Sequence, residues 1–131
     1  MKKQLIIIGL MLSSMAAKSE AVRVPHDRAV RAIVGEACSE PWEVQVRVAS
    51  AIRNRGTLKG VYGLNARHVS KQPNRVFRLA SAAWDASAKR DYAAGCTMFG
   101  SVEDDWYFMR VLKLKPAFTV GKTRFYRSKT A

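Results

Sequence analysis

The sequence predicts a mainly α-helical domain of about four helices with a minor β-hairpin at its C-terminal end. Apolar residues recur at helical spacing in several stretches, which are separated by Gly, Pro and Asn. Two short β-prone runs, residues 118–120 and 123–126, flank the turn-forming pair Gly121-Lys122. At 131 residues the chain has room for a single domain.

The first 21 residues have the pattern of a secretory signal peptide. A cationic start precedes an apolar run over residues 5–17, and small residues then offer a cleavage site after Ala17 or after Ala21. The apolar run is short for a membrane span, which needs roughly 20 apolar residues, and an uncleaved membrane anchor is the alternative. We therefore expect an exported protein, periplasmic or extracellular, whose mature domain is residues 22–131.

The first two helices are predicted on either side of Pro41. The first starts near Asp27, and its apolar positions are Ala29, Val30, Ile33, Val34 and Ala37. Pro41 interrupts this helix and suits the first position of a second helix, for which Glu40 would be the cap. The second helix spans residues 42–55 and ends at Gly56. Its apolar stripe consists of Val44, Val48, Ala51 and Ile52.

Further along the chain, the pattern predicts a loop followed by two more helices. Residues 56–71 form a long loop, and Asn74 begins the third helix. Residues 101–113 form the fourth helix, capped by Ser101 and closed by Pro116. Helical spacing favours the core for three large aromatic side chains, with ligand-binding platforms as the alternative: Trp84, Trp106 and Phe108.

The chain is strongly basic, with a formal net charge of +13. Removal of residues 1–21 takes away three lysines and one glutamate, which leaves a net charge of +11. This excess predicts a polyanionic partner, which could be nucleic acid, anionic lipid or an acidic cell-wall polymer. Export argues against intracellular DNA and favours the cell wall. We expect no nucleic-acid partner, no stable membrane insertion of the mature domain, and a monomer.

Two cysteines, Cys38 and Cys96, both lie in the mature domain. In an oxidising compartment they are candidates for a disulfide, and two buried free thiols are the alternative. Together with the well-separated His26 and His68 they make no zinc-binding pattern, so we predict no metal and no cofactor.

Glu36 is the candidate catalytic residue. It stands at the end of the first predicted helix, in a mostly apolar stretch. Apolar surroundings and the negative end of the helix dipole would both favour the neutral form of its carboxyl group. A carboxyl group that keeps its proton can donate it to the leaving oxygen of a glycosidic bond. The alternative is a solvated acid that merely ends a helix.

Other polar residues are candidates for the same site. Glu40 is either a helix cap or a second cleft acid, and Asp85 and Asp91 are further acids whose position the sequence leaves open. The amide of Asn54, at the end of the second helix, could hold a carboxyl or a sugar acetamido group. Tyr62, in a loop flanked by glycines, could stack on a sugar ring, and a simple turn is the alternative.

Residues 32–55 (AIVGEACSEPWEVQVRVASAIRNR) resemble the signature of the cell wall hydrolase family of the spore-cortex-lytic (SleB) type. The shared elements are an apolar helix ending in Glu-Ala, a Glu-Pro pair, and then Gln, Val-Ala and Asn-Arg. Residues 95–99 and 120–126 are more weakly similar to the closing segments of the family. Residues 60–63 resemble short phage and bacterial members.

The resemblance implies a lysozyme-like, transglycosylase-type fold that cleaves the β-1,4 bond between N-acetylmuramic acid and N-acetylglucosamine in peptidoglycan. The first Glu of the family signature is the general acid, and it falls on Glu36. The Glu before proline falls on Glu40, which is carried over as a supporting residue of the cleft. Glu40, Asn54 and Tyr62 are therefore the residues expected to bind the glycan strand.

The sequence departs from the family pattern at Cys38 and Met98. A bridge from Cys38 to Cys96 would hold the helix end beside the cleft. With one clear acid, the expected mechanism is that of a lytic transglycosylase, whereas hydrolysis by an N-acetylmuramidase would use a second carboxylate.

Two alternative interpretations assign the protein to other functional classes. In the first, the chain is a non-catalytic exported module that binds acidic cell-wall polymer through its basic face. In the second, it is a secreted nucleic-acid binder, which the charge permits. The second lacks the aromatic residues interleaved with Lys and Arg that would form a base-stacking surface.

Overall fold

The computed structural model describes residues 24–128. The predicted signal peptide, residues 1–21, lies outside the described residues. Within the described part of the chain, no helix is long and apolar enough to cross a membrane.

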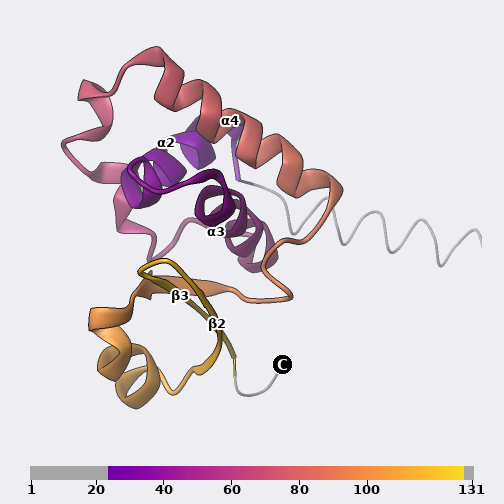
Figure 1. The fold of residues 1–131 in the computed structure, drawn as a ribbon, viewed down its shortest axis with the longest axis vertical. Helices are drawn as coiled ribbons and strands as arrows, with labels where there is room; N and C mark the ends of the chain where they lie inside the picture. Colours follow the sequence, from indigo (N-terminus) through magenta and orange to yellow (C-terminus); the bar gives the residue numbers. More distant parts are fainter. Residues whose placement is uncertain (1–23, 129–131) are drawn as a thin grey trace, which may run out of the picture.

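The predicted fold class, a mainly helical domain with a small C-terminal sheet, is confirmed (Figure 1). Three α-helices lie together in the upper part of the view, and a small antiparallel sheet lies below them. We call these parts the helical lobe and the sheet lobe. In chain order the elements are α2 (His26–Ala37), α3 (Trp42–Arg55), η1 (Tyr62–Asn65), η2 (Val69–Lys71), α4 (Asn74–Lys89), β1 (Met98–Ser101), η3 (Val102–Asp104), η4 (Tyr107–Val111), β2 (Lys115–Val120) and β3 (Thr123–Arg127).

The α-helices begin and end close to the predicted residues. Gly56 ends α3 in a left-handed conformation (φ 69°), and its N–H donates to the carbonyl of Ile52. Pro41 is the N-cap of α3 rather than its first helical residue. The predicted capping role of Glu40 is wrong, because no side chain caps α3. The backbone of Glu40 is used instead: its N–H donates to the carbonyl of Ala37, and its carbonyl accepts from Gln45 Nε2.

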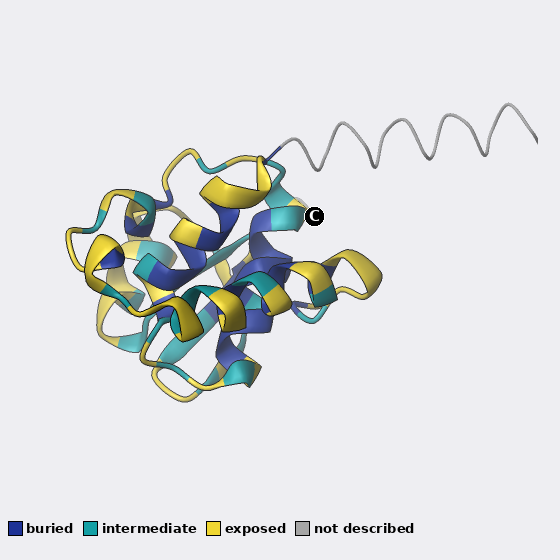
Figure 2. Ribbon diagram, turned by 90° about the horizontal axis from the view of Figure 1, so that it is seen from above, coloured by how far each residue is buried: buried dark blue, intermediate teal, exposed yellow. Residues whose placement is uncertain are grey.

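Helix α3 is the centre of the hydrophobic core. The sequence predicted one apolar stripe on α3, but α2, α4 and β1 all pack against it and bury residues around most of its circumference. In Figure 2 the inward faces of the helices are mostly buried, and their outward faces are exposed. Two polar side chains are buried on α3, Gln45 and Ser50, and the Ser50 hydroxyl accepts a hydrogen bond from the N–H of Tyr92. The core therefore holds α2 and α4 in fixed positions around α3.

The sheet has three strands in the order β1-β3-β2, all antiparallel. The predicted hairpin is formed by β2 and β3, and Gly121 provides the positive φ (59°) of its turn. Strand β1 was not predicted. Its Phe99 pairs with Phe125, whose ring stacks on Phe118 with a centroid distance of 4.8 Å. This aromatic layer joins the sheet to the core, in which Phe125 is fully buried.

The fourth predicted helix is only partly correct. Residues 102–111 are helical but irregular, with a 3₁₀ turn, η3, followed by a π-helical turn, η4. Ser101 is the N-cap as predicted, and its hydroxyl accepts from the N–H of Glu103. Pro116 lies within β2 rather than ending a helix. The segment carries no regular apolar stripe, and Trp106, which was expected in the core, is 62% exposed.

Candidate active site

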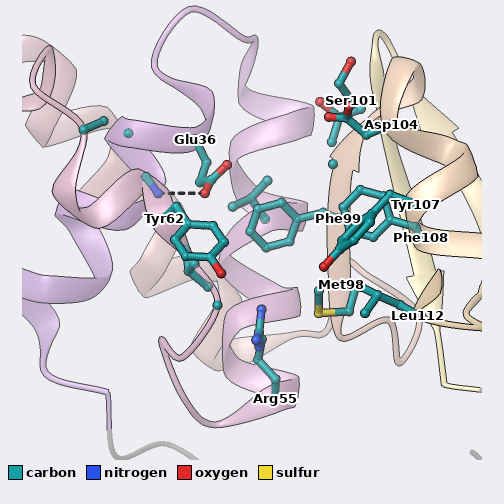
Figure 3. Close-up of a pocket in the computed structure, with 18 of the residues that line it drawn as sticks. Glu36, Arg55, Tyr62, Met98, Phe99, Ser101, Asp104, Tyr107, Phe108 and Leu112 are labelled. Atoms are coloured by element: carbon teal, nitrogen blue, oxygen red, sulfur yellow. Dashed lines mark hydrogen bonds between the residues drawn. The ribbon is translucent and has the colours of Figure 1, made fainter.

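A cleft of about 970 Å³ lies between the helical lobe and the sheet lobe (Figure 3). One wall is made by the ends of α2 and α3 and the loop that leads into η1, and it carries Glu36, Arg55 and Tyr62. The opposite wall is made by β1 and the irregular helical segment that follows it. A cleft between two lobes, open to solvent and mixed in polarity, is a common form of binding site for an extended ligand.

Glu36 lies in this cleft, on the last turn of α2. Its neighbours Ile33, Val34 and Ala37 point into the core, whereas the Glu36 side chain is exposed on the cleft side of the helix. Glu36 Oε1 accepts a hydrogen bond from the backbone N–H of Gly63 at 2.9 Å. The predicted apolar surroundings are therefore wrong: the apolar residues that flank Glu36 in sequence lie on the other face of the helix.

Two glycines bring η1 against the end of α2. A Cβ atom added at Gly35 would lie 2.7 Å from the Cα of Gly63 and closer still to its carbonyl oxygen. A Cβ atom added at Gly63 would lie 2.7 Å from Cγ of Glu36 and 2.8 Å from its backbone nitrogen. No Cβ fits at these distances, so the close approach requires glycine at both positions. This approach is what allows the Gly63 N–H to reach the Glu36 carboxylate.

Arg55 is the cation beside Glu36. Its guanidinium donates to the carbonyl of Lys59, which holds the side chain along the loop. Burial lowers the pKa of Arg55 below its usual value, and the negative charge of Glu36 opposes that shift. Arg55 remains charged at any physiological pH. Glu36 therefore stands between a backbone N–H and a positive charge, at a point open to an incoming ligand.

The opposite wall is aromatic. Phe99, Tyr107 and Phe108 line it, with Asp104 and Ser101 at one end. The ring of Phe108 stacks on that of Tyr126 at a centroid distance of 4.7 Å. This wall is formed by β1 and the helical segment that follows it. No periodicity in the sequence indicates that this segment lies against the cleft.

Asp105 attaches this wall to the sheet. Its carboxylate accepts hydrogen bonds from the Arg124 guanidinium and from the Tyr126 hydroxyl, both on β3. Burial and the adjacent Asp105 carboxylate raise the pKa of Tyr126 far above its usual value, whereas the Arg124 charge opposes this. The three groups form one polar cluster at the base of the segment that carries Tyr107 and Phe108.

Of the predicted binding residues, Glu40 and Tyr62 line the cleft and Asn54 does not. Tyr62 is 83% exposed and projects into the cleft (Figure 3). Asn54 Nδ2 instead donates to both carboxylate oxygens of Asp91 at 3.2 Å and to the carbonyl of Cys96 at 3.0 Å. Its amide does hold a carboxylate, as predicted, but this carboxylate is the side chain of Asp91 in the protein itself. The structure therefore does not bring Asn54 together with Glu36, Glu40 and Tyr62 in the cleft lining.

The two other acids considered from the sequence also lie outside the cleft lining. Asp91 accepts from the N–H groups of Ala93 and Gly95 and so shapes the turn before β1. Asp85 lies 3.5 Å from Nε2 of His26, where it links α4 to the start of α2. The carboxylates that do line the cleft are Glu36, Glu40 and Asp104.

Cys38 and Cys96 are free thiols in the structure, so the predicted bridge between them is not formed. Cys96 is fully buried, and burial raises the pKa of its thiol, although the neighbouring Arg127 opposes this shift. Among residues 24–128, no group of three or more His, Cys, Asp and Glu side chains is arranged to hold a metal ion.

Comparison of the chain with protein-family models, with curated proteins and with solved structures gave no match. A functional proposal therefore rests on the cleft, on the residues that line it and on the resemblance of residues 32–55 described above.

Proposed function

We propose that this protein is a peptidoglycan-degrading glycosidase that uses Glu36 as its general acid and cleaves the β-1,4 bond between N-acetylmuramic acid and N-acetylglucosamine. The observation that carries the proposal is the position of Glu36. It stands at a helix end, in a cleft between two lobes, with aromatic side chains on both walls. Aromatic rings are suited to pack against the apolar faces of sugar rings.

The open cleft is a polar environment, and a bound glycan would change it. A glycan strand that fills the cleft displaces water from around Glu36, and loss of water favours the neutral form of a carboxyl group. The protonated form is the one that can donate to the glycosidic oxygen. In this proposal, exclusion of water from the cleft, which Tyr62 and Phe99 line, takes the place of the apolar surroundings that we expected from the sequence.

With Glu36 as the acid, the simplest reaction is that of a lytic transglycosylase. Glu36 transfers its proton to the glycosidic oxygen as the bond from that oxygen to the anomeric carbon breaks. The N-acetyl group stabilises the cation that develops at the anomeric carbon. The 6-hydroxyl of the same muramic acid then bonds to this carbon and returns a proton to Glu36. The products are a 1,6-anhydro end and a free 4-hydroxyl, and no water is consumed.

Hydrolysis would need a second carboxylate to activate water or to act as a nucleophile. Glu40, between α2 and α3, and Asp104, in η3, are the other carboxylates on the cleft lining that could do this. The two outcomes differ in their products, because hydrolysis leaves a reducing end where transglycosylation leaves an anhydro ring.

Digestion of purified sacculi tests the proposal. The wild-type protein is expected to release soluble muropeptides with 1,6-anhydro ends, detected by mass spectrometry. Glu36→Gln, which keeps the side-chain shape and removes the proton donor, is expected to release at least about 10²-fold less. Glu43→Gln is the matched control, because Glu43 is exposed on the first turn of α3 and does not line the cleft.

Each other result has a defined meaning in this experiment. Reducing ends in place of anhydro ends would replace the transglycosylase with a hydrolase and direct attention to Glu40 and Asp104. Binding of wild-type protein to sacculi without any release of fragments would replace the enzyme with a wall-binding module. Equal release by wild type and Glu36→Gln would reject Glu36 as the acid.

A further inference from the structure

Five large hydrophobic side chains are exposed along the irregular helical segment of the sheet lobe, and two of them, Tyr107 and Leu112, also line the edge of the cleft. Their exposed fractions range from 39% to 62%. We call this surface the apolar tip, and it consists of Trp106, Tyr107, Met109, Val111 and Leu112. In Figure 1 the segment lies at the lower left of the molecule, beside the sheet and below the helical lobe. A concentration of exposed apolar side chains in seven residues of a small domain indicates an interaction surface.

The apolar tip is also cationic. Arg110, Lys113 and Lys115 are exposed within or directly after it. Glu103 and Asp104 are exposed just before the tip, but the sheet lobe as a whole is basic, because residues 98–128 contain six Lys or Arg and three Asp or Glu. One of the six, Arg124, is neutralised by Asp105. The tip therefore combines exposed apolar side chains with an excess of positive charge on the same surface.

We propose that the apolar tip docks on the surface of an anionic phospholipid bilayer. Aliphatic side chains such as Val111 and Met109 would enter the acyl boundary, where burial of apolar surface is favourable. Trp106 and Tyr107, whose rings meet edge to face, have the mixed polarity that suits the headgroup level. Arg110 and Lys113 would meet the lipid phosphates.

The combination of charge and apolar surface favours a bilayer over other partners. In a symmetric contact with a second copy of this chain, the same surface would meet itself and bring the like charges of Arg110 and Lys113 together. A hydrated acidic polymer would satisfy the cations but would leave the apolar side chains in water. An anionic bilayer satisfies both kinds of side chain at once.

The tip can be tested separately from the cleft. Trp106, Met109 and Val111 do not line the cleft, although Tyr107 and Leu112 do. Substitutions at the first three residues therefore change the proposed docking surface without changing the proposed active site. The docking proposal does not depend on the proposed glycosidase activity.

Vesicle flotation with the purified protein tests this proposal. The wild type is expected to bind vesicles of phosphatidylcholine mixed with phosphatidylglycerol, and to bind pure phosphatidylcholine at least about tenfold more weakly. The triple variant Trp106→Ser/Met109→Ser/Val111→Ser is expected to bind the mixed vesicles at least about tenfold more weakly than wild type. The pair Arg110→Gln/Lys113→Gln is expected to lose on the order of tenfold.

Matched controls are available on α4. Leu79→Ser removes a hydrophobic side chain that is 42% exposed, and Arg75→Gln/Arg78→Gln removes two exposed cations, in both cases away from the tip. These controls are expected to bind like wild type, and thermal unfolding of every variant verifies folding. Failure of the wild type to bind mixed vesicles, or undiminished binding by the triple variant, would overturn the proposal. So would a concentration-dependent dimer in sedimentation that the triple variant abolishes.

Discussion

The two walls of the cleft are held in place by different kinds of interaction. The wall that carries Glu36 rests on the helical core and on direct backbone contact between Gly35 and Gly63. The aromatic wall is held by one half-buried carboxylate, Asp105, and by the stacking of Phe108 on Tyr126. The position of Glu36 is thus set by backbone packing at Gly35 and Gly63, where no Cβ atom would fit. The position of the aromatic wall depends on a few polar groups that can be removed one at a time.

The largest effect is expected from Gly35→Ala. The new methyl group would overlap the backbone of Gly63, which cannot move without opening the contact between α2 and η1. We expect a loss of at least about 3 kcal/mol in the free energy of unfolding, measured by urea denaturation. Gly95→Ala is the control, because its Cβ would meet nothing within 4 Å and only its positive φ (81°) is strained, at about 1–2 kcal/mol. A loss for Gly35→Ala no larger than that of the control would show that this wall is not tightly packed.

A smaller effect is expected on the other wall from Asp105→Asn. This change removes the charge that both Arg124 and Tyr126 contact, and we expect a loss of about 1–3 kcal/mol in the free energy of unfolding. Glu103→Gln, an exposed residue on the same segment, should change that free energy by less than about 0.5 kcal/mol. If the two variants are equally stable, Asp105 does not anchor the aromatic wall.

Tyr62→Ala separates binding from stability on the helical wall. Tyr62 is so exposed that its loss should leave the free energy of unfolding unchanged. Loss of a stacking surface is expected to raise KM for soluble glycan fragments about tenfold with little change in kcat. Tyr62→Phe keeps the ring and should behave like wild type. A wild-type KM for Tyr62→Ala would remove Tyr62 from the substrate site.

The smallest effect is a pH dependence that belongs to the sheet lobe. The pKa of Tyr126 is raised in the folded protein, so above about pH 10 the unfolded chain releases this proton while the folded chain keeps it. The contribution of Tyr126 to stability is therefore complete below about pH 10 and declines as the pH rises further. Between about pH 9 and pH 11, the unfolding temperature of the wild type should fall more steeply with rising pH than that of Tyr126→Phe. Parallel curves would show that Tyr126 does not titrate in this way.

Local signals predicted most of the helical lobe. Gly56 ends α3 because the left-handed conformation of its backbone favours glycine, and this preference is visible in sequence. The helical period of the apolar residues is likewise visible in the sequence, and it predicted the positions of α2 and α4. The fourth helix, predicted over residues 101–113, is irregular over 102–111. Its tertiary contacts could not be predicted from local sequence, because Arg124 and Tyr126, the partners of Asp105, lie 19 and 21 residues further along the chain.

The sequence predicted the cleft residues that a single local element positions. It missed those whose position depends on contacts between distant parts of the chain. Glu36 and Tyr62 lie in the cleft because a single helix end and a single glycine-flanked loop carry them. Asn54 has the same local character as a binding residue, but Asp91 and the Cys96 carbonyl, both distant in sequence, use its amide. Phe99 had no recognisable signal because β1 becomes a strand only by pairing with β3. Phe108 was expected in the core from its helical spacing, but it is half-buried and lines the cleft.

The central claim is that Glu36 supplies the proton that breaks the glycosidic bond, and the most direct test measures binding and cleavage together. Wild type and Glu36→Gln are incubated with the same purified sacculi, and both sacculus-bound protein and released muropeptides are measured over time. We expect the variant to bind as wild type does and to release fragments at least about 10²-fold more slowly. Release by Glu36→Gln within about twofold of the wild-type rate, far less than removal of a general acid causes, would contradict the claim.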